Sequence, residues 1–275
     1  MAMAEELIRL VEGIEDGDLL ALPPEYSFVP MAAIRALVAR PARDLRLLVV
    51  PVGGMGVDML IGAECVASVE AAAVGLGEAG PAPCFVRAVQ NGDIVMRDST
   101  CPAIHTSLQA AEKGVPFMPL GGLVGSDLVK NRDDWRVVDD PLGDGNGPIV
   151  LLPAIRPDVA LFHSPLADRD GNVWIGRRRE LATMAHAAKT TLVTAEKIQE
   201  ESLLADEKTA AGTLTSLYVS AVAEVEGGCR PLGLLGQYEP DLDQVRDYAR
   251  QAKTPEGFRD YLHQYVLGPP AQAAQ

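Results

Sequence analysis

Hydrophobic positions along the chain follow two spacings. Apolar residues at helical spacing predict helices over residues 5–14, 31–39, 104–113, 181–189 and most of 241–266. Continuous apolar runs bounded by Pro, Gly or Asp predict buried strands over residues 19–22, 45–52, 149–152, 159–163 and 191–194. Weaker strand-like runs lie at 66–74, 84–89 and 94–96.

The order of these elements indicates the fold class. The strand at 19–22, the helix at 31–39 and the strand at 45–52 form a β-α-β unit, whose usual product is a parallel sheet covered by helices. No internal repeat with a period of about 20–50 residues is present. The sequence therefore predicts a single α/β domain with a mainly parallel sheet over residues 1–268, followed by a disordered tail at 269–275.

Two glycine-rich turns after predicted strands are candidate ligand sites. Their residues are Gly53, Gly54 and Gly56 in the first turn, and Gly121, Gly122, Gly125 and Ser126 in the second. Glycine lets a backbone approach a ligand closely, but neither turn is a G-x-G-x-x-G dinucleotide motif, and no P-loop is present. A purely structural turn, and for Ser126 a helix N-cap, are the alternatives.

A third candidate is a polar group between a predicted strand and a predicted helix. Asp98, Ser99 and Thr100 offer one carboxylate and two hydroxyls there; the alternative is that they cap the helix. Glu25 is predicted to be a solvated loop carboxylate. The segment 168–172 is typical of a β-turn whose Asp and Asn side chains bond local backbone.

Composition excludes several protein classes. A hydrophobic content of 48% suits a large core and excludes a disulfide scaffold or a disordered chain. The 24 Lys and Arg residues against 38 Asp and Glu give a net charge of −14, which disfavours general binding to nucleic acid or anionic membranes. The four cysteines are widely spaced, so we expect reduced thiols, no metal site and a cytoplasmic location. Residues 1–14 carry three glutamates, unlike a secretory signal, and no apolar run reaches the roughly 20 residues of a membrane span.

Five motifs follow one another in a distinctive order. They are LQAAEKGVPFMP at 108–119, GSDL at 125–128, AIRPDVA at 154–160, ADRDGNV at 167–173 and AKTPEGF at 252–258. Together they resemble the family I CoA-transferases, in particular the A (alpha) subunit of the glutaconate CoA-transferase type. The resemblance covers about residues 5–268.

The resemblance implies a function shared with a second subunit. In the family, CoA moves from an acyl-CoA to a carboxylate through a glutamyl-CoA thioester, formed on a glutamate of the homologous B (beta) subunit. That glutamate lies in a serine-glutamate-asparagine-glycine motif, which this chain lacks. The expected assembly is therefore two A and two B chains, with CoA as a substrate and no tightly bound cofactor. This chain would supply substrate-binding residues, namely Gly53, Gly54, Gly56, Ser99, Thr100, Gly121, Gly122, Gly125 and Ser126.

Three departures from the family pattern leave other functions open. The loop at 23–30 has no glycine where the family has a Gly-rich loop, Gly121 replaces a basic residue, and Asp98 replaces a glutamate. In a hydrolytic branch that opens steroid-derived rings on CoA thioesters, that glutamate is the base, which makes Asp98 the tentative catalytic residue here. The alternatives are thus the subunit of a ring-opening CoA-thioester hydrolase, or a non-catalytic subunit that binds acyl-CoA. The missing basic residue also disfavours a dicarboxylate acyl group.

Overall fold

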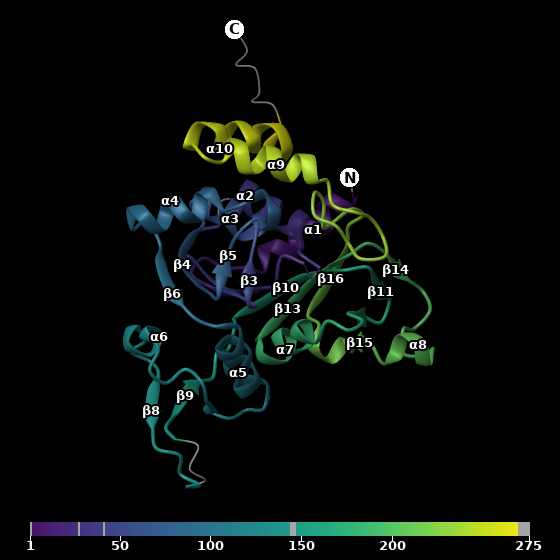
Figure 1. Ribbon diagram of the computed structural model, residues 1–275. Coiled ribbons are helices and arrows are strands. Elements are labelled where there is room, and N and C mark those ends of the chain that lie inside the picture. Colours follow the sequence, from purple (N-terminus) through teal and green to yellow (C-terminus); the bar gives the residue numbers. More distant parts are fainter. Residues whose placement is uncertain (1, 27, 41, 144–146, 269–275) are drawn as a thin grey trace.

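A parallel sheet forms the centre of the molecule (Figure 1). The computed structural model describes residues 2–26, 28–40, 42–143 and 147–268. The sheet has seven strands in the order β16-β13-β10-β1-β2-β4-β6, and every neighbouring pair runs parallel. In chain order the strands are β1 (Leu19–Leu22), β2 (Leu45–Val49), β4 (Val66–Ala71), β6 (Val95–Asp98), β10 (Val159–Ser164), β13 (Thr190–Ala195) and β16 (Ala221–Glu224). The predicted α/β fold with a mainly parallel sheet is confirmed.

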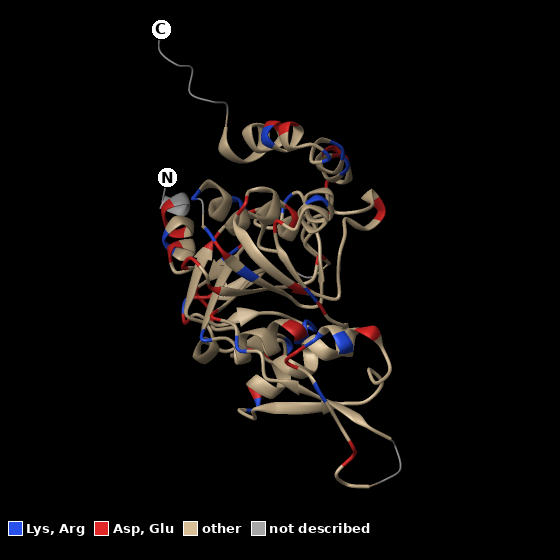
Figure 2. Cartoon of the chain, turned by 90° about the vertical axis from the view of Figure 1, so that its left-hand side faces the viewer, with Lys and Arg blue, Asp and Glu red and all other residues tan. Residues whose placement is uncertain are grey.

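Alternate side chains of the strands pack into two separate hydrophobic cores, one on each face of the sheet. In β1, Leu20 and Leu22 enter one core while Ala21 enters the other, because successive side chains of a strand point to opposite faces. The first face is covered by α1 (Ala2–Glu12), α2 (Met31–Ala39), α3 (Met55–Gly62) and α4 (Pro83–Asn91). Above these helices lie α9 (Leu242–Gln251) and α10 (Pro255–Leu262), as Figures 1 and 2 show. The second face is covered by α5 (Cys101–Glu112) and α7 (Arg179–Ala187).

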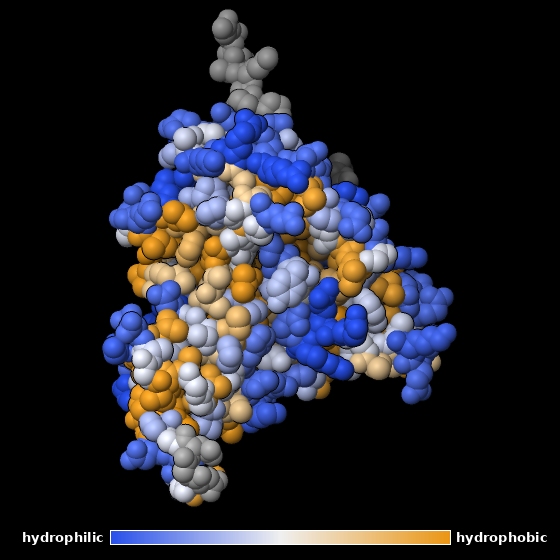
Figure 3. Space-filling model, in the orientation of Figure 1, coloured by the Kyte–Doolittle hydropathy of each residue, from blue (hydrophilic) through white to orange (hydrophobic). Residues whose placement is uncertain are grey.

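A small antiparallel sheet projects from the α5 side of the molecule (Figure 1). Its strands are β7 (Phe117–Leu120), β9 (Ile149–Pro153) and β8 (Arg136–Val138), in the order β7-β9-β8, with α6 (Asp127–Asn131) beside them. The predicted strand at 149–152 is confirmed, but it pairs here rather than in the parallel sheet. Trp135, Val150 and Leu152 form its core. Figure 3 shows apolar atoms gathered over this region, where Phe117 and Val137 are exposed.

The remaining elements are short. A four-stranded sheet joins β14 (Ile198–Gln199), β11 (Leu166–Asp168), β12 (Val173–Trp174) and β15 (Thr213–Leu214), and β3 (Val52–Gly53) pairs with β5 (Ala73–Val74). Single turns of helix are α8 (Glu207–Ala210), η1 (Gly77–Ala79), η2 (Ser216–Tyr218) and η3 (His263–Leu267). The predicted turn at 168–172 is confirmed, since Asp168 Oδ1 accepts hydrogen bonds from the N–H groups of Asp170 and Asn172 at 3.0 and 2.9 Å.

One predicted element has the wrong type. The run at 84–89, which is predicted to be strand-like, lies in helix α4, which begins with Pro83 and is capped after Asn91 by Gly92 with φ +75°. Its buried residues, Cys84 and Ala88, are four residues apart, which is helical spacing. The tail predicted at 269–275 lies outside the described residues. Within the described residues, no helix combines the length and apolar character that crossing a membrane requires.

Candidate functional site

The carboxyl ends of β1, β2, β4 and β6 bring several candidate residues to one edge of the sheet. Ligands of open α/β sheets bind outside this edge. Backbone hydrogen bonds hold the segments after these strands together: Glu25 donates to Val52, Gly75 to Gly53, and Ser99 to Ala71. We call Glu25, Gly53, Gly54, Asp98 and Ser99 the carboxyl-edge cluster.

Glu25 faces the glycine turn. Its Oε1 accepts a hydrogen bond of 2.8 Å from the N–H of Met55, the first residue of α3. A Cβ built on Gly54 would lie 1.8 Å from the carboxyl carbon of Glu25, so glycine at 54 leaves the space that this carboxyl occupies. The prediction that Glu25 is solvated is therefore wrong: the side chain is partly buried and bonded to the start of a helix.

The surroundings of Glu25 favour its neutral form. Burial raises the pKa of Glu25 from 4.5 to about 8, and the charge of nearby Asp58 adds to the rise against the opposing hydrogen bond from Met55. At neutral pH the group is therefore mostly protonated and can donate a hydrogen bond. The contact between Glu25 and the glycine turn has no signal in the sequence, because only the fold shows that a loop after β1 meets the turn after β2.

Asp98, Ser99 and Thr100 take three different roles. Thr100 caps α5, its Oγ1 accepting from the N–H of Ala103 at 3.2 Å, so the capping alternative is confirmed for this residue. Ser99 is 7% exposed, and its hydroxyl has no hydrogen-bond partner among the described residues. Asp98 is exposed at the end of β6. Of the three, Ser99 thus offers the buried polar group that is free for a ligand.

The start of α5 is a poor anion site by itself. Pro102 has no N–H group. The N–H of Ala103 donates to Thr100 Oγ1, and the N–H of Ile104 donates to the Thr100 carbonyl. This leaves the N–H of Cys101 as the donor that could face a ligand. A ligand here would therefore need Ser99 as well as the helix.

A group of ion pairs fixes the end of β6. Arg132, with a side chain only 4% exposed, contacts Glu70 at 2.9 Å and Asp134 at 2.9 Å. Its Nη1 also donates to the carbonyl of Asp98 at 3.1 Å. Arg97 pairs with Asp134 at 3.0 Å. Because Arg132 follows α6, this group ties the small antiparallel sheet to the carboxyl edge.

The other predicted glycines are placed by local structure. A Cβ on Gly56 would lie 2.5 Å from Ile34 Cδ1, and one on Gly53 3.0 Å from Val57, so both positions serve close packing around α3. Gly122 and Gly125 have φ near +85°, which favours glycine, in an exposed loop after β7. Gly121 and Ser126 share that loop, and the Ser126 hydroxyl donates to the Leu123 carbonyl at 2.7 Å rather than capping α6. The second glycine turn thus belongs to the small sheet, and Leu123 of the same loop shares an apolar cluster with Ala103 of α5.

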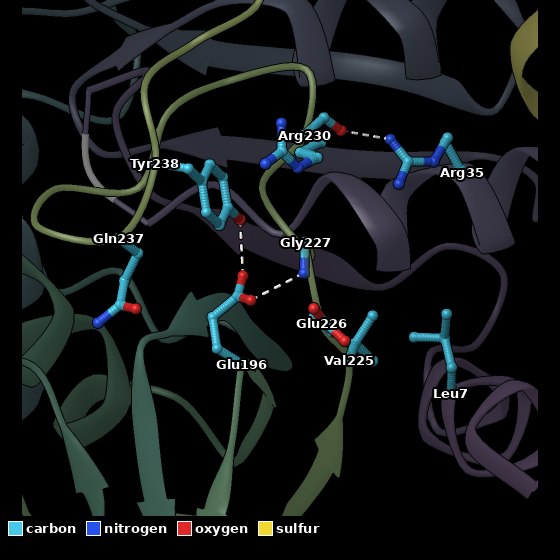
Figure 4. Close-up of a pocket in the computed structure, with 9 residues that line it drawn as sticks. All are labelled: Leu7, Arg35, Glu196, Val225, Glu226, Gly227, Arg230, Gln237 and Tyr238. Carbon is cyan, nitrogen blue, oxygen red and sulfur yellow. Dashed lines mark hydrogen bonds between the residues drawn. The ribbon is translucent and has the colours of Figure 1, made fainter.

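A larger pocket of about 850 Å³ lies at the other end of the sheet edge, after β13 and β16 (Figure 4). Its wall includes Glu196, whose carboxylate accepts from Tyr238 Oη at 2.6 Å and from the N–H of Gly227 at 2.8 Å. His163 Nε2 lies 2.8 Å from the same carboxylate. Five strand spacings of about 4.8 Å, roughly 24 Å, separate β13 from β6.

The neighbours of Glu196 keep it in its ionised form. Burial alone would raise its pKa, but the hydrogen bonds from His163, Tyr238 and Gly227 outweigh burial and lower the pKa to about 2. A carboxylate with so low a pKa takes up protons poorly at neutral pH. Arg35, which bonds the carbonyl of Arg230, completes the pocket wall in Figure 4. Among the described residues no group of three His, Cys, Asp or Glu side chains could hold a metal ion.

Curated relatives cover most of this chain. It is 30% identical over 275 residues to the A subunit of 3-oxoadipate CoA-transferase from Pseudomonas knackmussii, covering 96% of this chain and 94% of the relative. It is 30% identical over 247 residues to the cholesterol ring-cleaving hydrolase IpdA subunit of Rhodococcus jostii, covering 87% and 83%. An uncharacterized protein of Archaeoglobus fulgidus is 32% identical over 214 residues, 77% of this chain, but this chain spans only 47% of that protein's length.

Solved structures and a family model agree with these relatives. The glutaconate coenzyme A-transferase of Acidaminococcus fermentans superposes with a TM-score of 0.87 at 26% identity, covering 95% of this chain and 87% of that chain. The family model described as Coenzyme A transferase matches residues 4–221. The chain therefore belongs to the coenzyme A transferase family.

Proposed function

We propose that this chain is the A subunit of a heteromeric CoA-transferase. The enzyme would move CoA from an acyl-CoA to a carboxylic acid through a glutamyl-CoA thioester on a homologous B subunit. The reaction exchanges one carboxylate for another as the acyl partner of CoA, so no oxidant, reductant or tightly bound cofactor is consumed. The observation that carries the proposal is the near full-length similarity to a relative that is named as the A subunit of a CoA-transferase.

The carboxyl-edge cluster is the part of this chain that we assign to substrate. The unpartnered hydroxyl of Ser99 and the N–H of Cys101 would face a polar group of the substrate, because a buried hydroxyl without a partner gains most from a ligand that bonds it. Gly53 and Gly54 would line the same edge, with Thr100 holding the start of α5. The exposed loop with Gly121, Gly122, Gly125 and Ser126 would contact substrate only if the partner brings it into the shared active site.

The proposal is tested by reconstitution. The purified chain alone should show negligible CoA exchange. Mixed with a B-type subunit that carries the serine-glutamate-asparagine-glycine motif, an acyl-CoA and an acceptor acid, it should exchange CoA and form a borohydride-sensitive glutamyl thioester on the partner. We expect two A and two B chains in the assembly. Failure to bind any B-type subunit, or turnover by the isolated chain, contradicts the proposal.

The relative from Rhodococcus jostii favours a second candidate, the subunit of a ring-opening CoA-thioester hydrolase. Asp98 would be the base, held at the end of β6 by the bond from Arg132 to its carbonyl. Asp98→Asn should then abolish water-dependent turnover in the complex while leaving CoA binding intact. Full CoA transfer by the same variant would assign the chain to the transferase instead. Binding of acyl-CoA without turnover in any complex would indicate a non-catalytic subunit.

A further inference from the structure

A small, mostly apolar pocket of about 210 Å³ lies beside Glu25. Its walls come from the η1 turn, from the segment that precedes α9, and from α9 itself. The apolar lining residues are Leu76, Ala79, Leu232, Pro240, Leu242 and Val245. The volume is below the range of about 300–1,000 Å³ that takes drug-sized ligands, so only a small group fits.

Glu25 is the polar group of this pocket that can bond a ligand. One carboxyl oxygen, Oε1, is used by the N–H of Met55, and the carboxyl lies where a side chain of residue 54 would stand. Two other charged groups, Glu78 and Arg246, line the pocket. Arg246 lies 3.1 Å from Asp243, and the two side chains are 62% and 95% exposed, so the charge of Arg246 is screened by water and adds little attraction for an anionic ligand inside the pocket.

We propose that this pocket binds the acyl chain of the thioester substrate, a short uncharged aliphatic group, with the Glu25 carboxyl bonded to a carbonyl oxygen at its end. This inference rests on the proposed function, since it names the acyl class that the transferase would accept. A second carboxylate on the acyl chain would lose its hydration among apolar walls and approach Glu78, and the solvated Arg246 would offset little of that cost, which disfavours dicarboxylate chains. The proton that Glu25 holds at neutral pH makes it a donor to a carbonyl.

A purely structural role for Glu25 makes a different prediction. Gly54 occupies the N-cap position of α3 and has no side chain to cap it, and the Glu25 carboxyl supplies the missing acceptor to Met55. If capping were its only role, the pocket would bind no ligand, and Glu25 variants would change stability alone. Glu25→Gln keeps both an acceptor for Met55 and a neutral donor, whereas Glu25→Ala removes both.

The test measures the binding of small amides to the full chain. Binding is detected by calorimetry and by shifts in the methyl NMR signals of Leu232, Leu242 and Val245. Butyramide carries a short chain and a carbonyl, and succinamate adds a charged end. We expect butyramide to bind and succinamate not to bind. Leu242→Trp, which enlarges a half-exposed side chain of the pocket lining, should abolish binding, while the control Leu142→Trp on an exposed loop should leave it unchanged. Glu25→Ala should weaken binding about tenfold, as the loss of one hydrogen bond implies, and Glu25→Gln should restore it.

The pH dependence of binding separates Glu25 from its neighbours. Methyl butyrate keeps the short chain and the carbonyl of butyramide but has no N–H to donate to an ionised carboxylate, so its binding should fall as pH rises through about 8, where Glu25 loses its proton, and should stay constant in Glu25→Gln. Asp58, Glu78 and Arg246 are the other charged groups near Glu25, and all are present in both proteins. Binding that is unaffected by Leu242→Trp and Glu25→Ala, or no binding of butyramide, overturns the inference.

Transfer assays keep this inference distinct from the proposed function. With a B subunit, butyryl-CoA should be used in preference to succinyl-CoA, and Leu242→Trp should reduce that preference. Equal use of both substrates, unchanged by Leu242→Trp, rejects the pocket while the transferase stands. Butyramide binding to the wild-type chain without transfer in any complex rejects the transferase while the pocket stands.

Discussion

The carboxyl group of Glu25 rests on the Cα of Gly54. A Cβ at residue 54 would lie 1.8 Å from the carboxyl carbon of Glu25, a distance that no pair of non-bonded atoms tolerates. Gly54 has φ −140° and ψ −139°, which lies outside both the helical and the extended regions. The two residues come from loops after neighbouring strands, β1 and β2, and each determines what the other position can hold.

Gly54→Ala should therefore be destabilising because of Glu25. We expect a loss of about 1–3 kcal/mol in the free energy of unfolding, typical of overpacking, measured by urea denaturation. In a Glu25→Ala background the same change should cost much less, giving a coupling of about 1 kcal/mol or more between the two sites. Gly121→Ala is the matched control, because a Cβ there meets no atom within 4 Å, and it should change stability by less than about 0.5 kcal/mol. Additive effects of the two changes would contradict the steric account.

The raised pKa of Glu25 predicts a pH-dependent loss of stability. Between pH 4.5 and about 8 the folded chain retains a proton that the unfolded chain has released. The stability contributed by this proton is fully present below pH 4.5 and is lost as pH rises to about 8. Relative to Glu25→Gln, the wild type should lose up to about 1.4 kcal/mol for each pH unit in that window. Parallel stability curves for the two proteins would show that Glu25 titrates normally.

Local patterns in the sequence were enough to predict the parallel sheet. The apolar runs at 19–22 and 159–163 are buried on both faces, and continuous apolar strands of this kind occur in helix-covered parallel sheets. The run at 84–89 misled because Val86 and Val89 are residues typical of strands, whereas the surrounding Pro83 and Gly92 are helix boundary signals. In this segment the residues that begin and end a helix were thus a better guide than the strand preference of the residues between them.

The candidate site was less predictable because it depends on contacts between distant segments. Ser99 and Thr100 were identified from their place between a strand and a helix, which is a local feature. Glu25 contacts Gly54 and Met55, which lie 29 and 30 positions further along the chain, and nothing near Glu25 in the sequence indicates these contacts. Arg132 likewise meets Glu70 from 62 positions away. Such pairs become visible only when the strand order brings their loops together.

Ser99→Ala should separate folding from substrate binding. Removing a buried hydroxyl that has no partner among the described residues should leave stability unchanged or raise it by about 1 kcal/mol. If Ser99 bonds substrate, CoA transfer in the reconstituted complex should fall about tenfold. Thr100→Ala, which removes the α5 cap, should instead lower stability by about 1 kcal/mol in thermal melts. A strongly destabilised Ser99→Ala would mean that the hydroxyl has a structural partner.

The low pKa of Glu196 predicts sensitivity to acid. Its hydrogen bonds to His163 and Tyr238 stabilise the folded state above the ordinary glutamate pKa of 4.5, and this stability is lost as pH falls toward about 2. Tyr238→Phe removes one of these donors and should lower stability at pH 7 by about 1–3 kcal/mol, as expected for a bond to a charged group. The difference from wild type should shrink on acidification, which chemical denaturation at several pH values would measure. A difference independent of pH would show that Tyr238 acts through packing or through the hydrogen bond that its Oη accepts from the N–H of Cys229, and that its bond to Glu196 adds little.

Arg132 should be the residue on which the end of β6 depends most. Its guanidinium is 4% exposed and balances the carboxylates of Glu70 and Asp134, so Arg132→Met would leave Glu70, only 12% exposed, with the more distant Arg97 at 3.6 Å as its remaining cation. Removing one partner of a buried ion pair costs about 3–5 kcal/mol, and we expect a loss in that range. Arg132→Lys keeps the charge but cannot bond Glu70, Asp134 and the Asp98 carbonyl together, so it should recover only part of the stability.

A control variant and a local measurement distinguish a role of Arg132 at the end of β6 from a role in the stability of the whole fold. Arg9→Met breaks an exposed pair with Glu5 and should change stability by less than about 0.5 kcal/mol. In hydrogen exchange, the amides of β6 and Ser99 should exchange faster in Arg132→Met, because local opening near the lost ion pair then requires less free energy than global unfolding. The relative exchange rates of the amides within β13 should stay in the same order. Equal acceleration across all seven strands would mean that Arg132 supports the whole fold and has no particular role at the carboxyl edge.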